Sequence, residues 1–150
     1  LNLFGGASTI ETYNNSTGAE HDQYQGVTGV TYDIGPISLG AQVSAIFDGE
    51  TSQLLYYHTY KNTAYGIAFN INDDFSVSYG KHDSYKKGGN NHWSGSANSK
   101  NDRLVEVMSW QAAYTMGGAS FRVADVKADN AVFVSGANQH ATVISMSLAF

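Results

Sequence analysis

Hydrophobic side chains alternate with small or polar ones along several segments of this chain, and this period of two is the feature that most limits its fold. In Ile37–Phe47, one face reads Ile, Leu, Ala, Val, Ala and Phe, and the other reads Ser, Gly, Gln, Ser and Ile. Successive side chains of a strand point to opposite faces of a sheet, whereas a helix repeats every ~3.6 residues. The segment is therefore predicted to be a strand, and the chain to be all-β.

Three short turn signals join segments with this alternation. Gly35 precedes the only proline, Pro36, and the other two signals are Asn-Asp-Asp at 72–74 and the pair Gly117 and Gly118. Gly, Asn and Asp adopt the backbone angles of tight turns, so each signal predicts a hairpin. About eight strands are expected. They are residues 1–10, 24–34, 37–47 and 54–71, a strand beginning at 75, one ending at 116, one beginning at 119 and one ending at 150.

Longer polar stretches separate these hairpins. Residues 11–23, 85–101 and 129–138 are rich in Asn, Gly, Ser and charge, which predicts loops. Outer-membrane barrels show the same alternation, with tight turns in the periplasm and long loops outside the cell. To preserve it, residues 54–71 must form one long strand, because a turn near Lys61 would invert every later strand.

The composition limits the environments and partners of such strands. No apolar run approaches the ~20 residues of a transmembrane helix, so only strands could span a membrane. The net charge is −5 and only Lys86 and Lys87 form an adjacent basic pair, so nucleic acid is not an expected partner. The absence of cysteine excludes disulfides and cysteine-based zinc sites. Residues 1–10 lack the pattern of a signal peptide, so the chain is expected to be processed or a fragment.

The side chains opposite the apolar ones favour a membrane over water. In a soluble sandwich or barrel, which is the alternative, this face usually carries Lys and Glu. Here it holds Ser, Gly, Ala, Asn and Gln, and the charges are expected in loops and at strand ends. Aromatic residues gather near the short turns, as in the periplasmic girdle of an outer-membrane barrel. The expected girdle residues are Tyr32, Phe69, Phe75, Tyr114 and Phe121.

The small size of the side chains on the polar face bears on the width of such a barrel. An eight-stranded barrel has a narrow interior that side chains must fill, whereas a barrel of about 16 strands encloses water. Ser, Gly and Ala fill an interior poorly, so residues 1–150 are expected to form about half of a wide transmembrane antiparallel β-barrel. The remaining N-terminal strands would pair with its open edges, which are costly in lipid. The alternative is a complete eight-stranded barrel that acts as an adhesin or structural anchor.

Alternation also predicts which side chains face the lumen. The expected pore-lining residues are Arg122, Gln42, Asn70, Gln111 and Ser78. Arg122 shares its face with Ser120 and Ala124, and an arginine on the lipid face near mid-membrane would cost ~2–4 kcal/mol. It is expected either to belong to a basic wall that biases the charge of solutes or to pair with a neighbouring carboxylate.

No pattern of catalytic or metal-binding residues emerges. None of the five histidines stands with a nucleophile in a recognisable motif. His82 and Asp83 are neighbours in an expected strand, so they point to opposite faces. Asp73 and Asp74 are ordinary turn residues. We therefore expect neither an enzyme nor a protein that binds a metal or cofactor.

Three segments together resemble the C-terminal half of alphaproteobacterial general porins. They are AYGIAFNINDDFSVSYGKHDS, QAAYTMGGASFRVADV and the terminal ATVISMSLAF. The resemblance implies a 16-stranded, homotrimeric barrel of the bacterial outer membrane, in contact with lipid and lipopolysaccharide, that lets small hydrophilic solutes diffuse passively. It also implies a C-terminal signal for the barrel-assembly machinery, formed by Phe150, Leu148, Met146 and Ile144. The loop that folds into the lumen of such porins and forms an acidic constriction is not recognisable in this sequence.

Overall fold

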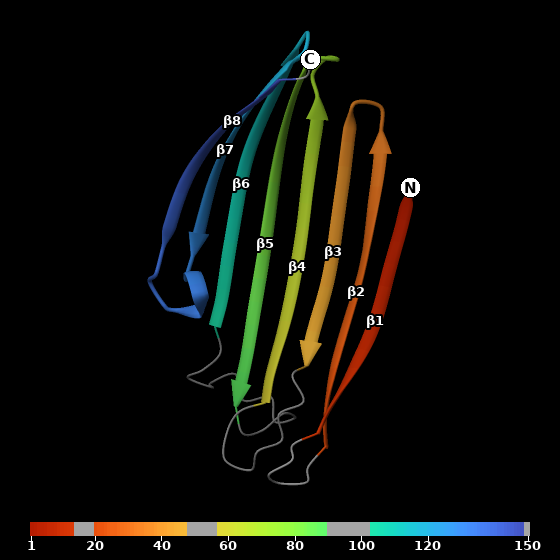
Figure 1. Ribbon diagram of the computed structural model, residues 1–150, viewed down its shortest axis with the longest axis vertical. Helices are drawn as coiled ribbons and strands as arrows, with labels where there is room; N and C mark the ends of the chain where they lie inside the picture. Colours follow the sequence, from red (N-terminus) through yellow and green to blue (C-terminus); the bar gives the residue numbers. More distant parts are fainter. Residues whose placement is uncertain (14–19, 48–56, 90–102, 149–150) are drawn as a thin grey trace.

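The computed structural model describes residues 1–13, 20–47, 57–89 and 103–148, and its eight strands form one antiparallel sheet (Figure 1). The strands follow one another across the sheet in chain order, and each pairs with its sequence neighbours. They are β1 Asn2–Tyr13, β2 Glu20–Ile34, β3 Ile37–Phe47, β4 Tyr57–Asn70, β5 Phe75–Gly89, β6 Arg103–Met116, β7 Ala119–Asp129 and β8 Gln139–Leu148. The all-β prediction and the number of strands are confirmed. The sheet is open, because β1 and β8 form its two edges.

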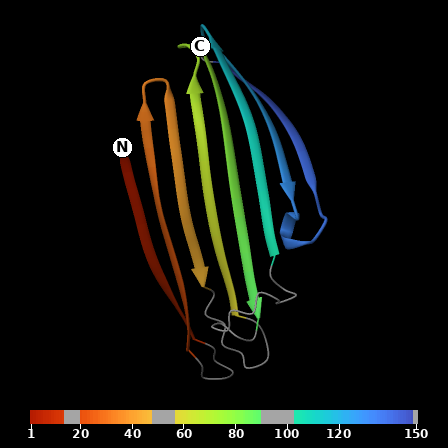
Figure 2. The same cartoon turned by 180° about the vertical axis from the view of Figure 1, so that it is seen from behind.

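The three predicted short turns lie at one end of the sheet, which we call the short-turn end; the opposite end is the long-loop end. Gly35 and Gly117 have φ angles of 54° and 59°, in a region that glycine enters without the clash of a Cβ atom. In the third turn, Asn72 Oδ1 accepts hydrogen bonds from the backbone N–H groups of Asp74 and Phe75, at 2.9 and 2.8 Å. The view from behind shows the same two ends (Figure 2).

Several strands run further toward the long-loop end than the sequence predicts. β1 extends to Tyr13, β2 begins at Glu20 and β5 extends to Gly89, so the loops predicted at 11–13, 20–23 and 85–89 are wrong. The pairing of β4 with β5 continues without interruption to Tyr57 and Gly89. Cross-strand pairing therefore overrides the polar local composition. Residues 14–19, 54–56, 90–101 and 149–150, which also carry predictions, lie outside the described residues.

The sheet encloses no hydrophobic core within the part of the chain that the structure describes. Ala131 is the only buried residue there, while Trp110 is 64% exposed and Ile144 80% exposed. Every described residue of β8 is exposed. The described helical segment is far too short to cross a membrane. The sheet is thus a single layer, and no second layer of the described residues packs against its apolar face.

Candidate functional site

The cross-strand register sorts the side chains into two faces, because residues paired across strands point to the same side. All five residues expected to line a pore fall on one face, which we call the polar face. The pairs that connect them are Gln42 with Ala64, Asn70 with Ser76, Ser78 with Gln111 and Arg122 with Ala113. The expected girdle residues and Ile144, Met146 and Leu148 lie on the opposite, apolar face.

A row of small residues crosses the polar face, nearer to the short-turn end than to the long-loop end. Gly40 pairs with Gly66, Gly66 with Gly80, and Gly80 with Ser109. Three neighbouring strands therefore present no side chain at this level. A Cβ atom at Gly66 would lie 3.2 Å from the carbonyl oxygen of Tyr79, which leaves little room for a larger residue. At this level the sheet therefore lacks the large side chains that would fill the interior of a narrow barrel.

Hydrogen bonds between polar side chains tie neighbouring strands together on the same face. Ser84 Oγ donates to Asn62 Oδ1 at 2.6 Å, and Asn62 Nδ2 donates to Ser44 Oγ at 3.3 Å. These three half-buried residues form a chain across β3, β4 and β5. Gln25 Nε2 donates to Ser8 Oγ at 2.7 Å between β2 and β1. Polar side chains of this face thus form hydrogen bonds with one another, and the surface of the face stays hydrophilic.

Few charges lie on the polar face of the described residues, and cations outnumber anions. Arg122 is exposed and stands beside Ala113 and Ser145 of the neighbouring strands, without a salt bridge to any described carboxylate. The pairing with a neighbouring carboxylate that the sequence left open is therefore not found there. Lys86 lies near the long-loop end of the same face, and Asp33 accepts a hydrogen bond from Ser38 Oγ at 2.6 Å near the short-turn end.

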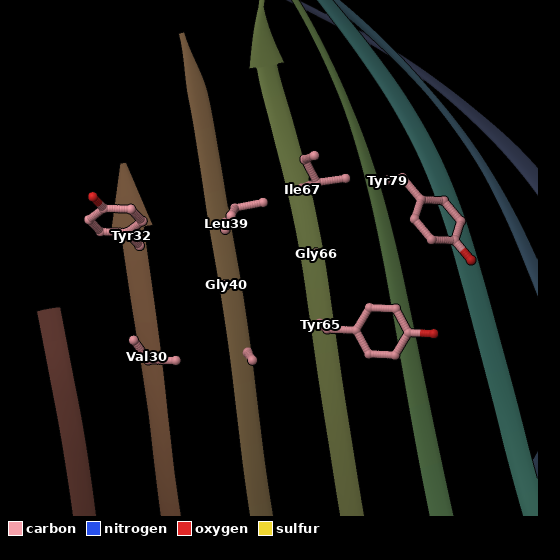
Figure 3. A pocket seen from close by; sticks show the side chains of 9 residues that line it. Val30, Tyr32, Leu39, Gly40, Tyr65, Gly66, Ile67 and Tyr79 are labelled. Carbon is pink, nitrogen blue, oxygen red and sulfur yellow. The ribbon is translucent and has the colours of Figure 1, made fainter. Parts of the chain in front are cut away.

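The apolar face is aromatic toward the short-turn end. The rings of Phe75 and Tyr114 lie 6.5 Å apart, and those of Tyr79 and Trp110 lie 4.6 Å apart. A shallow apolar hollow of about 480 Å³ opens on this face over β2 to β5, and Figure 3 shows Tyr32, Tyr65 and Tyr79 around it. The remaining lining residues are Val30, Leu39, Gly40, Ala41, Gly66 and Ile67.

Charged residues occupy the apolar face toward the long-loop end, which corrects the expectation that they lie only in loops and at strand ends. Lys81 Nζ lies 2.6 Å from Glu106 Oε1 and 3.4 Å from Asp83 Oδ1, all within β5 and β6. In β7 and β8, His140 Nε2 lies 2.6 Å from Asp125 Oδ2, which also accepts a hydrogen bond from the Thr142 hydroxyl at 3.2 Å. The face therefore changes from apolar to charged along the strands.

The connection between β7 and β8 contains a site that sequence reasoning missed. It is a loop, as predicted, except that Asp129 is the last residue of β7, and it holds a short 3-10 segment, η1, at Ala131–Phe133. The Phe133 ring lies 5.8 Å from the Tyr60 ring of β4, in an edge-to-face arrangement. The one available signal is the apolar run of residues 131–134 within an otherwise polar loop.

The described residues offer no group of three potential metal ligands. His82 and Asp83 lie on opposite faces of β5, since His82 pairs with Ala64 and Asp83 with Thr63. Comparisons of the chain with protein-family models, with curated proteins and with solved structures find no match. The chemistry available to the sheet is thus that of its two faces: one is apolar toward the short-turn end and charged toward the long-loop end, and the other is mainly polar, with a row of glycines.

Proposed function

We propose that this sheet is part of the wall of a bacterial outer-membrane β-barrel, and that its polar face lines a water-filled channel for passive diffusion of small hydrophilic solutes. The observation that carries the proposal is the exposed apolar face opposite a mainly polar face that carries the glycine row. Hydrocarbon is the solvent that such an apolar surface requires, and water is the solvent that the polar one requires.

The row formed by Gly40, Gly66 and Gly80 supports a wide channel. A closed barrel of eight strands would need side chains at this level to fill its interior. The open edges at β1 and β8 support further strands of the same barrel as partners, because unpaired backbone groups are costly in lipid. A barrel of about 16 strands satisfies both requirements.

The partners that follow from this proposal are outer-membrane lipid, lipopolysaccharide, two further copies in a homotrimer and the barrel-assembly machinery. Ile144, Met146 and Leu148 support the last of these, because they alternate on the apolar face and are 80%, 58% and 54% exposed. A catalytic role has no support from the described geometry. The alternative of a small, filled barrel that acts as an adhesin is less favoured because of the glycine row.

Planar-bilayer recording with the purified full-length protein tests the proposal. Stable, large and weakly selective conductance steps are expected. Arg122→Glu reverses a charge on the polar face and is expected to shift the anion-to-cation permeability ratio toward cations by about twofold or more. Lys127→Glu, on the apolar face of the same strand, is the matched control and should leave the ratio unchanged. A membrane that stays silent with well-folded protein would contradict the proposal.

A further inference from the structure

The β7–β8 connection lies against the wall and reaches well beyond its own hairpin. Its segment η1 contacts β6, and Phe133 contacts Tyr60 of β4. Tyr60 belongs to the polar face, because it pairs with Ile46 on one side and with Lys86 on the other. Since β5 and β6 separate β4 from β7, Phe133 can reach Tyr60 only across the polar face of these two strands.

Hydrogen bonds hold the connection in this position. The Asn130 amide donates through Nδ2 to the Leu104 carbonyl oxygen of β6, at 3.1 Å, and accepts through Oδ1 from the Gly136 N–H group, at 3.0 Å. The backbone adds a bond from Ala131 N–H to the Ala137 carbonyl oxygen, at 2.7 Å. Ala131 itself is buried. The connection is a compact loop anchored to the wall.

The backbone of this loop is strained. Asn130, Val132 and Phe133 have φ angles of 55°, 52° and 60°. Asparagine tolerates this region, but a β-branched residue such as Val132 and a bulky one such as Phe133 are genuine outliers there. Strain of this kind persists where the surrounding structure fixes it, and it gathers at sites that hold a particular geometry. Here the geometry that it holds is the inward position of Phe133.

A cation stands beside the aromatic contact. Lys86 Nζ lies 5.6 Å from the centre of the Tyr60 ring, in the geometry of a cation–π interaction. Lys86 is half-buried and lies on the polar face, whereas the next residue, Lys87, points to the apolar face. Two aromatic rings and one positive charge thus meet at the long-loop end of the polar face.

We propose that the β7–β8 connection narrows the mouth of the channel, with Phe133 and Tyr60 limiting solute size and Lys86 favouring anionic solutes. This inference rests on the proposed channel function. Aromatic rings form a firm steric boundary, and a fixed charge at a narrow point acts on every solute that passes it. The site admits small anionic or neutral hydrophilic solutes more readily than cations.

Single-channel recording with variants of the full-length protein tests this assignment. Phe133→Ala should raise the conductance and the size limit for neutral polyethylene glycols, by roughly 1.5-fold in conductance. Tyr60→Ala removes the same contact from β4 and should have the same effect, and the double variant should add little to either. Val134→Ala, a change in the following residue, which is 54% exposed and has extended backbone angles, is the matched control and should leave both readings unchanged.

The charge is tested separately. Lys86→Gln should lower the anion-to-cation permeability ratio by roughly twofold, while Lys87→Gln should not change it. If the unmodified protein conducts but the Phe133 and Tyr60 variants keep its conductance and size limit, the narrowing assignment is overturned and the channel function stands. If Lys86→Gln leaves the ratio unchanged, the charge assignment is overturned. If the unmodified protein does not conduct, the proposed function and this inference both fail.

Discussion

The β2–β3 and β7–β8 pairs are built from the same kind of strand but present different surfaces. Val43 and Asp125 occupy the same position in their strands, counted from Ile37 and Ala119, and each pairs with a threonine, Thr28 or Thr142. Both lie on the apolar face. The β2–β3 pair stays apolar at this level, while the β7–β8 pair already carries a carboxylate in contact with His140.

This difference shows that distance from the short turn does not by itself determine the environment of a side chain. The apolar face of β3 continues through Ala45 to Phe47, and it fits hydrocarbon over the whole strand. On the apolar face of β7, the next two side chains after Val123 are those of Asp125 and Lys127. This part of the sheet therefore fits contact with polar groups. The polar faces differ too, because the connection of β7 with β8 reaches across the sheet.

The largest expected effect comes from moving a charge between the two pairs. Val43→Lys should destabilise the protein in lipid vesicles by ~2–4 kcal/mol, the cost of lysine near the centre of a bilayer. Gln42→Lys, one residue away on the polar face, should cost little. Asp125→Val should cost far less than Val43→Lys, because a side chain in polar surroundings can lose its charge at little cost in stability. Urea unfolding in vesicles measures all three, and equal costs for Val43→Lys and Gln42→Lys would contradict the assignment of the faces.

A smaller effect is expected at the β7–β8 connection. Asn130→Ala removes two side-chain hydrogen bonds and places a Cβ-bearing residue without a local partner at positive φ, so it should cost ~1–3 kcal/mol. Asn130→Gly loses the same bonds but tolerates the angle, and should cost about half as much. The same urea experiment separates the two contributions. If Asn130→Ala lowers the free energy of unfolding by less than ~1 kcal/mol, the connection is not anchored as described.

The sequence predicted what depends on neighbouring residues. A period of two is a local property, so the placement of Gln42 and Arg122 on one face and Phe69 on the other followed from the alternation. The turns at Gly35 and Gly117 followed from backbone requirements of the same local kind.

What the sequence missed depends on residues that are far apart. The contact between Phe133 and Tyr60 joins β4 to the connection after β7, and a pattern along the chain contains no information on that pairing. The salt bridge of Lys81 with Glu106 depends on the register of β5 with β6. The strand ends were also misplaced, because pairing with a neighbour extends β5 through the polar residues 85–89.

The short turn of the β2–β3 pair offers a sharper test of local backbone control. Gly35→Ala should cost about 1 kcal/mol, because alanine is strained at a φ angle of 54° although nothing lies within 4 Å of the added Cβ atom. Gly118→Ala, in the turn between β6 and β7, is the matched control, since Gly117 and not Gly118 has the positive angle there. If both variants unfold at the same urea concentration, the strain at Gly35 is absent.

The smallest effect is expected for the contact between His140 and Asp125, which distinguishes the β7–β8 pair. His140 and Asp125 are 56% and 41% exposed, so solvent screens their interaction, and His140→Gln should lower the urea midpoint by less than Gly35→Ala does. Thr142 keeps its hydrogen bond to Asp125, which limits the loss further. A larger loss than that of Gly35→Ala would mean that the two side chains are removed from water in the assembled protein, because an uncompensated charge is expensive only when it is buried. The polar surroundings inferred for β7 and β8 would then be those of an interface with another protein surface, and the contrast with β2 and β3 would mark where that interface begins.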